Sequence, residues 1–284
     1  MLDPDYRANA TAGFNQIPAT GPYTLAGGNS AIFVSLPKLS QKYKSIAAKI
    51  RKIATDGSAA SYLPPGPDYG ANPAMVKGYA SQLLALASLL ENPKAPSLET
   101  PWATGTLAWA FLLHPLSRGT VRLNLSAPLD QPILDYRAGT NPIDFDLHLA
   151  HLRFLRSLIS TPTMRKYGAV ETSPGSTVPD TDEALIPYIK DQILLSFLHP
   201  CCTAATMPRS KGGVVGPDLK VHGAKGLRVV DMSVLPVLPS AHLSATAYAV
   251  AEKVRKYFFF SPLRNVEVVS ERRAKADSGN RLHR

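Results

Sequence analysis

The chain is organised around Phe197–Val254, which reads F-L-H-P-C-C-T-A-A-T-M-P at Phe197–Pro208, G-G-V-V-G-P-D-L-K-V-H-G-A-K-G-L-R-V-V-D-M-S-V-L-P at Gly212–Pro236 and P-S-A-H-L-S-A-T-A-Y-A-V-A-E-K-V at Pro239–Val254. His199 follows an apolar run, and His242 stands directly before an alanine-rich segment of helical periodicity. Two imidazoles brought to one point can share proton chemistry. The sequence therefore predicts that both histidines serve one site.

The composition is that of a globular chain. With 284 residues, 45% of them hydrophobic, and a mean hydropathy of −0.05, the chain can bury a core as one large domain or two small ones. Its longest apolar runs, such as Leu83–Leu90, are too short to cross a bilayer, and the acidic start of the chain does not resemble a secretory leader. We expect no membrane segment and, by default, a cytoplasmic location.

The formal net charge of +10 says little about binding partners. Much of the positive charge falls in residues 261–284, which we expect to form a basic, disordered tail behind one unit of residues 1–260. Most basic tails are solvated ends, so nucleic acid is not expected as a partner. An interaction module that uses this tail is a minor alternative.

Several chemistries are excluded or disfavoured by motif. Cys201 and Cys202 are adjacent, so they cannot bridge distant segments and lack metal-ligand spacing, and they fit a reducing compartment. His148 and His151 share a helix face without a third ligand, so no metal site is predicted. The sequence contains no G-x-S-x-G, and no two glycines are separated by one residue, which removes the serine-hydrolase and dinucleotide-binding fingerprints.

Hydrophobic periodicity predicts the main elements. Residues 1–37 suit extended chain and turns, ending in a strand near Ala31–Leu36. Five helices are predicted. The first starts at Pro37, and the others span 73–90, 142–159, 180–198 and 244–260, with His199 directly after the fourth. The predicted strands are Gly105–Leu113 and Gly119–Leu125, paired as a hairpin, with short strands at 219–221 and 227–230.

Strands and helices are segregated rather than alternating, which favours an α+β fold over a doubly wound one. We expect a mostly antiparallel sheet that contains the predicted hairpin and is covered on one face by the helices at 142–159 and 180–198.

Three residues are candidates for chemistry on their own merits. His199 is a possible base, although a helix-end histidine bonded to a carbonyl is an equally good interpretation. His242 precedes a helix N-terminus, where negative charge is stabilised, but a polar residue there is more often a cap. Asp231 ends an apolar strand-like run and by itself is no more than a turn former.

The three quoted stretches together resemble the C-terminal signature of the glucose-methanol-choline (GMC) oxidoreductases, flavoenzymes that oxidise alcohols. H-P-L-S-R-G-T-V-R-L at His114–Leu123, and the P-L-D-Q-P-I-L-D-Y-R and N-P-I-D-F-D-L-H-L that follow, are similar to the same family. The resemblance covers about 107–259. It implies the family's substrate-binding domain, plus a C-terminal segment that packs on the FAD domain.

The resemblance also implies roles for single residues. His199 matches the family's catalytic base, and His242 matches its histidine or asparagine partner that hydrogen-bonds the substrate oxygen. Asp231 and Met232 match positions beside the ribityl-phosphate side of FAD, while His242, Leu243 and the helix to Val254 match positions by the flavin ring. The implied reaction converts an alcohol to an aldehyde or ketone, with hydride passing to FAD.

Two departures limit this prediction. The family's H-P-x-G-T is here His199-Pro200-Cys201-Cys202-Thr203, and Gly216 stands where the family usually has aspartate. The N-terminal part that binds the ADP half of FAD has no counterpart, so the chain resembles the second half of such an enzyme. The alternative is an inactive remnant or binding protein, and we expect the exposed flavin-facing surface to associate with another chain.

Overall fold

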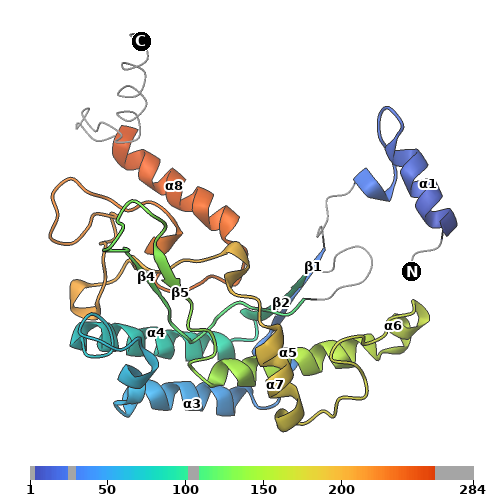
Figure 1. The fold of residues 1–284 in the computed structure, drawn as a ribbon, viewed down its shortest axis with the longest axis horizontal. Coiled ribbons are helices and arrows are strands. Elements are labelled where there is room, and N and C mark those ends of the chain that lie inside the picture. The colour runs from blue at the N-terminus through green and yellow to red at the C-terminus, as the bar shows by residue number, and fades with distance from the viewer. Residues whose placement is uncertain (1–3, 25–29, 102–108, 260–284) are drawn as a thin grey trace.

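The computed structural model describes residues 4–24, 30–101 and 109–259, and the predicted tail at 261–284 lies outside them. Helices and two small antiparallel sheets make up this part of the chain (Figure 1). The predicted α+β class is confirmed. Within the described residues, no helix combines the length and the apolar character needed to cross a membrane.

A pair of helices forms the base of the molecule. α3 (Tyr43–Thr55) packs on α4 (Pro73–Glu91), and a short α2 (Leu36–Leu39) precedes them. Ile50 of α3 and Leu83 of α4 are fully buried in the main core, where both predicted apolar stripes meet. Asn72 caps α4 by accepting hydrogen bonds from the amides of the first turn, and Pro73 starts the helix.

Three further helices continue this layer: α5 (Ile143–Ile159), α6 (Pro162–Lys166) and α7 (Asp182–Gln192). The predicted helix at 180–198 is too long, because α7 ends at Gln192 and His199 therefore does not cap it. Ile193 adopts extended backbone, so that Leu194 and Leu195 lie along a cavity. Packing has overridden helix propensity here.

The first sheet has the order β1–β2–β3, with every pair antiparallel: β1 is Ala31–Ser35, β2 is Pro96–Pro101 and β3 is Phe111–Leu112. The second pairs β4 (Thr120–Arg122) with β5 (Ile133–Asp135). The predicted hairpin between 105–113 and 119–125 is therefore wrong, since the two segments join different sheets. Part of its first strand, 102–108, lies outside the described residues.

The loop between those segments explains the error. The carboxylate of Asp144 on α5 accepts hydrogen bonds from Leu116 N at 2.7 Å, Ser117 N at 3.0 Å and Ser117 Oγ at 2.6 Å. His114–Gly119 is thus tied to α5 instead of forming a tight turn. A contact distant in sequence decides the strand pairing.

The N-terminal region also departs from prediction. α1 (Pro4–Phe14) is a helix where extended chain was expected, because its interior is rich in alanine and contains no proline after Pro4. A short helical turn, η1 (Pro22–Thr24), follows it. Figure 1 shows α1 standing apart from the helical base.

The chain from 199 to 242 crosses the molecule as irregular structure and ends in α8 (Leu243–Phe259). The predicted strands at 219–221 and 227–230 form only isolated bridges, Val215 with Val221 and Lys220 with Arg228. Gly78 lets this segment approach α4 closely, since a Cβ there would lie 2.1 Å from the carbonyl oxygen of Lys211.

Candidate active site

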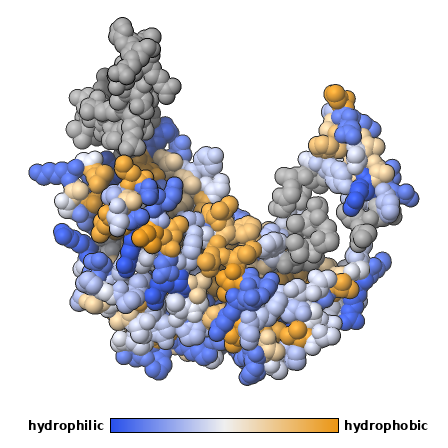
Figure 2. Space-filling view, in the orientation of Figure 1, coloured by the Kyte–Doolittle hydropathy of each residue, from blue (hydrophilic) through white to orange (hydrophobic). Residues whose placement is uncertain are grey.

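A cavity of about 1630 Å³ opens beside the first sheet, between the segment after α7 and the segment before α8. Apolar residues gather at the centre of the face drawn in Figure 2, between the lobe that carries α8 and the α1 arm. Both candidate histidines line this cavity.

The two imidazoles meet. Nε2 of His199 lies 3.3 Å from Nδ1 of His242, and the ring centroids are 5.2 Å apart. The structure therefore brings together the two histidines that the sequence predicted to serve one site. At this distance one of the two facing nitrogens donates a hydrogen and the other accepts it.

Backbone hydrogen bonds hold the two segments together. Cys202 N donates to Met232 O at 3.1 Å, Ala204 N to Ser233 O at 2.9 Å and Thr206 N to Val234 O at 2.8 Å. These bonds align residues 202–206, just after His199, with residues 232–234, which lead to His242. Tertiary hydrogen bonding, rather than the end of α7, positions the first histidine.

A buried carboxylate that the sequence prediction missed stands on the other side of His242. Oε1 of Glu99, at the centre of β2, lies 2.5 Å from Nε2 of His242, and the Glu99 side chain is only 2% exposed. The two atoms are close, but no well-aligned hydrogen bond joins them. The sequence signal was weak: a single acidic residue in a short run between two prolines.

The sheet register explains why Glu99 points to this place. Glu99 is the cross-strand partner of Phe111 on β3, so both side chains share one face of the sheet. The Phe111 ring meets the ring of His242 edge-on, with centroids 6.3 Å apart. The face that carries Glu99 is therefore the face that His242 covers.

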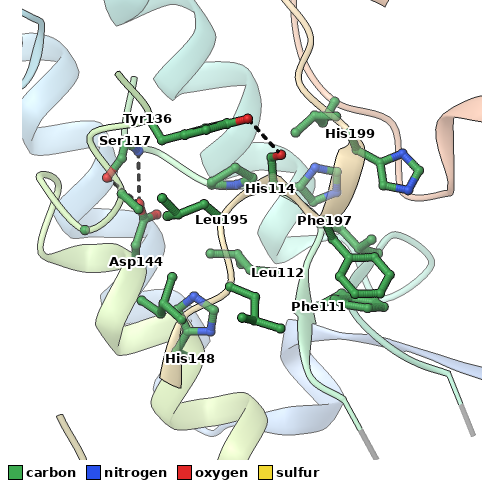
Figure 3. Close-up of a pocket in the computed structure, with 18 of the residues that line it drawn as sticks. Phe111, Leu112, His114, Ser117, Tyr136, Asp144, His148, Leu195, Phe197 and His199 are labelled. Carbon is green, nitrogen blue, oxygen red and sulfur yellow. Dashed lines mark hydrogen bonds between the residues drawn. The ribbon is translucent and has the colours of Figure 1, made fainter. Parts of the chain in front are cut away.

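Aromatic rings gather next to the histidines. Trp109, Phe111 and Phe197 form a cluster, with ring centroids 4.7 Å apart for the two phenylalanines and 5.6 Å apart for Trp109 and Phe197. Figure 3 shows Phe111 and Phe197 together on the side of the cavity below His199. We call Trp109, Phe111 and Phe197 the aromatic cluster.

The backbone before His199 is strained. Ser196, Phe197 and Leu198 have φ angles of 54°, 45° and 62°, a left-handed turn made by three consecutive residues that are not glycine. Each such residue costs about 1–2 kcal/mol relative to the right-handed form. Ser196 Oγ also donates a hydrogen bond at 3.3 Å to Oη of Tyr136, the residue directly after β5 (Figure 3).

The remaining predicted site residues fall into three places. Leu243 lines the cavity at the start of α8. Asp231 accepts hydrogen bonds from Ser233 and so starts a short helical turn, in which Met232 receives the ladder bond from Cys202; neither residue lines the cavity. Val254 is buried in a small core with Val215, so the structure gives it a packing contact.

Comparison with known proteins agrees with the signature. Residues 115–251 match the C-terminal family described as GMC oxidoreductase. The chain contains a GMC oxidoreductase C-terminal domain. Of the quoted motifs, the parts at 199–203 and 236–243 line the cavity together with the two facing histidines.

Several relatives are similar over most of the chain. A structure of a new fungal aryl-alcohol oxidase is 64% identical, with a TM-score of 0.81, over 89% of this chain and 42% of that one. An FAD-dependent oxidoreductase from Chaetomium thermophilum is 37% identical, with a TM-score of 0.79, over the same shares. The dehydrogenase xptC of Emericella nidulans is 36% identical over 64% of this chain and 29% of that protein. The chain thus spans less than half the length of these GMC relatives.

GMC oxidoreductases are FAD-dependent, and part of this site fits the reactive end of a flavin. The cavity wall beside the two histidines is apolar, with Pro239, Ala241 and Leu243 following one another up to the start of α8. The first turn of α8 carries no acidic residue, so its amides present positive potential to a developing negative charge. Neither the sequence nor the described residues supply the glycine-rich phosphate loop that the other half of FAD requires.

Burial lowers the pKa of three further histidines, and two of them, His114 and His148, also line the cavity (Figure 3). His114 is 1% exposed and its Nε2 contacts Ser240 Oγ at 2.9 Å, while His151 is completely buried against Ser97. The pKa of His151 falls furthest, because burial is reinforced by the neighbouring His148 and His114. Burial also lowers the pKa of His148, against the opposing charge of Asp144.

Proposed function

We propose that this GMC chain supplies the acid–base residues and the substrate cavity for flavin-dependent oxidation of alcohols, with aryl alcohols as the preferred class. The observation that carries the proposal is the 3.3 Å contact between His199 and His242 on the wall of the cavity. Two imidazoles in contact can hold one alcohol oxygen and remove its proton.

Each residue then has a role in proton transfer. An alcohol oxygen that enters beside the two rings replaces the contact between them. Nε2 of His199 accepts the hydroxyl proton, and Nδ1 of His242 donates a hydrogen bond to the same oxygen. This assignment leaves Nε2 of His242 facing the carboxylate of Glu99, which orients the imidazole ring.

The chemistry that FAD supplies when bound is acceptance of the hydride from the carbinol carbon. His242 and Leu243 would adjoin its ring, and we propose contacts to its ribityl side from Asp231 and Met232. Val254 would support the same helix from inside its core.

The aromatic cluster supports the choice of substrate class. Its three rings lie next to the histidine pair, and offset or edge-on contacts between aromatic rings add about 0.5–1.5 kcal/mol beyond simple apolar burial. An aryl group held there would bring its benzylic oxygen towards the two imidazoles. The 64% identical fungal relative is an aryl-alcohol oxidase, which agrees with this choice.

The test uses this chain joined to the FAD-binding half of the aryl-alcohol oxidase relative, with flavin reduction followed without oxygen. Benzyl alcohol should reduce the flavin at least about tenfold faster than cyclohexylmethanol, which has the same carbon skeleton without the aromatic ring. His199→Ala should lower the rate by about 10²- to 10⁴-fold while flavin stays bound. His222→Ala is the matched control, because His222 contacts Met207 O and not the pair.

Full activity in His199→Ala would overturn the assignment of the base. Equal rates for the two alcohols would overturn the aryl preference but not the base. Flavin that binds and is reduced by no alcohol would favour the non-catalytic alternative, a binding protein.

We also propose that the apolar face around the cavity is covered by another chain or domain. Leu194, Leu195 and Phe197 line the cavity and are each about half-exposed. Exposed apolar surface of this kind marks an interaction site. The isolated chain should sediment as a self-associated species, and the chain joined to an FAD-binding half should sediment as a smaller, defined one.

A further inference from the structure

The two cysteines of the chain form a pair on the cavity wall. Cys201 and Cys202 are the only cysteines in the sequence, both are free thiols, and both are half-buried. They line the same cavity as His199 and follow it after a single proline. Any thiol chemistry of this protein therefore takes place next to the histidine pair.

The backbone at this pair is unusual for a cysteine. Cys202 has a φ of 72°, in the left-handed region that glycine adopts without strain, and it stands where the GMC motif has glycine. Its amide is fixed by the ladder bond to Met232 O at 3.1 Å. A second sulfur is thus held beside the first at a position where glycine would be less strained.

The two sulfur atoms already interact. The Cys201 thiol hydrogen-bonds the Cys202 sulfur, which lowers the pKa of Cys202 and raises the pKa of Cys201. The positive charge of Arg118, which lies over the Tyr79 ring, adds to the lowering at Cys202. One sulfur is thus prepared to react as a thiolate and the other to follow it as a thiol.

From this geometry we propose that Cys201 and Cys202 are a peroxide-sensitive dithiol that closes reversibly to a vicinal disulfide. In the first step the Cys202 thiolate attacks one oxygen of hydrogen peroxide; the O–O bond breaks, Cys202 becomes a sulfenic acid, and the released hydroxide takes up a proton to form water. In the second step the Cys201 sulfur attacks the sulfenic sulfur, an S–S bond forms, and a second water leaves with the Cys201 proton. Two electrons pass from the two sulfurs to the peroxide.

The resulting ring is strained and easily reversed. Neighbouring Cα atoms are about 3.8 Å apart across a trans peptide, whereas disulfides usually join Cα atoms about 4.4–6.8 Å apart. A strained disulfide is more readily reduced, which suits a switch better than a permanent link.

Closing the ring should disturb His199. The chain after Cys202 is held by the ladder to 232–234, so the backbone must adjust on the other side, at Cys201, Pro200 and His199. The only side-chain partner that the structure gives His199 is His242, at 3.3 Å. Oxidation should therefore separate the two imidazoles.

The test needs no catalytic activity. The reduced chain is treated with graded hydrogen peroxide, free thiols are blocked with iodoacetamide, and intact mass is measured. The wild-type chain should lose both thiols together and two hydrogen atoms of mass, as a monomer, and dithiothreitol should restore both thiols. Cys201→Ser should stop at a sulfenic acid that dimedone traps. Cys202→Gly, which fits the left-handed backbone but removes the attacking sulfur, should keep its remaining thiol at the same peroxide level.

Other outcomes overturn the proposal. A wild-type chain that gains oxygen without losing hydrogen, forms disulfide-linked dimers, or keeps both thiols at peroxide levels that oxidise Cys202 in Cys201→Ser does not contain this dithiol. The effect on the histidines is read separately from imidazole NMR signals. Oxidation should shift those of His199 and His242 but not that of His222, and unchanged signals in the oxidised chain would exclude the coupling to the pair.

Discussion

Nε2 of His242 lies 2.5 Å from Oε1 of Glu99, so a half-exposed histidine before α8 is paired with a carboxylate buried at the centre of β2. A buried carboxylate is costly unless a positive or hydrogen-bonding partner compensates it. The contact therefore orients the ring of His242, and it explains why a glutamate is tolerated in the middle of a sheet.

Replacing Glu99 by glutamine should separate function from stability. Glu99→Gln keeps the shape but removes the charge that holds the hydrogen on Nε2 of His242, so alcohol oxidation by the chain joined to an FAD-binding half should fall at least about tenfold. The melting temperature should stay the same or rise, because a buried charge is removed. Glu91→Gln is the control: it breaks a surface pair with Arg51 and should leave the rate unchanged. A rate in Glu99→Gln equal to wild type would contradict the role of the carboxylate.

Asp144 should be a major source of stability. Asp144→Ala leaves the amides of Leu116 and Ser117 without their acceptor in a buried place, so the free energy of unfolding should fall by about 2–4 kcal/mol. Asp146→Ala, two residues further along α5, removes only an exposed ion pair with Lys49 and should lower the free energy of unfolding by less than about 1 kcal/mol. Urea unfolding of the two variants measures the difference, and equal losses would contradict the proposed anchor.

The buried histidines should make the fold sensitive to acid. The folded-state pKa of His114 and of His151 is lowered by burial, so the unfolded chain binds more protons as the pH falls below the ordinary histidine value of 6.5. Their contribution is fully present above that pH and is lost between it and the folded-state pKa. Each unit of depression corresponds to about 1.4 kcal/mol.

The measurement is the urea midpoint between pH 8 and pH 5. His151→Gln, which keeps hydrogen-bonding atoms but does not titrate, should flatten the decline. The same decline in wild type and variant would assign the acid sensitivity to other groups.

Glycine substitutions at Leu195 and Leu198, in and beside the left-handed turn before His199, should change the free energy of unfolding in opposite directions. Leu198 has a φ of 62° and is 96% exposed, so Leu198→Gly relieves strain and should raise the free energy of unfolding by about 0.5–1 kcal/mol. Leu195 has an ordinary φ of −74°, so Leu195→Gly only adds freedom to the unfolded chain and should lower stability by a similar amount. Thermal unfolding of both variants tests the sign, and a destabilised Leu198→Gly would show that its side chain matters more than its backbone.

The sequence pattern predicted those helices in which buried apolar residues recur at a regular spacing. The apolar stripes of α4 and α5 follow a period of three to four residues and predicted these two helices closely. The single helix predicted from Pro37 is wrong at its start, because extended backbone at Ser40 divides it into α2 and α3. The same local patterns failed where a distant contact decided the outcome. Asp144 directs the loop at 114–119 away from a hairpin, and cavity packing ends α7 before residue 193.

By itself, the sequence determined the α+β class, the main helices and the membership of His199 and His242 in one GMC signature, because periodicity and spaced motifs are properties of the linear chain. Only the tertiary structure decided that the two rings meet, that Glu99 lies behind His242, and that Cys202 takes a left-handed backbone beside the cavity. These features depend on strand register and on backbone bonds between segments far apart in the sequence. No local pattern encodes such a register, since it is set by the balance of packing and hydrogen bonding over the whole fold.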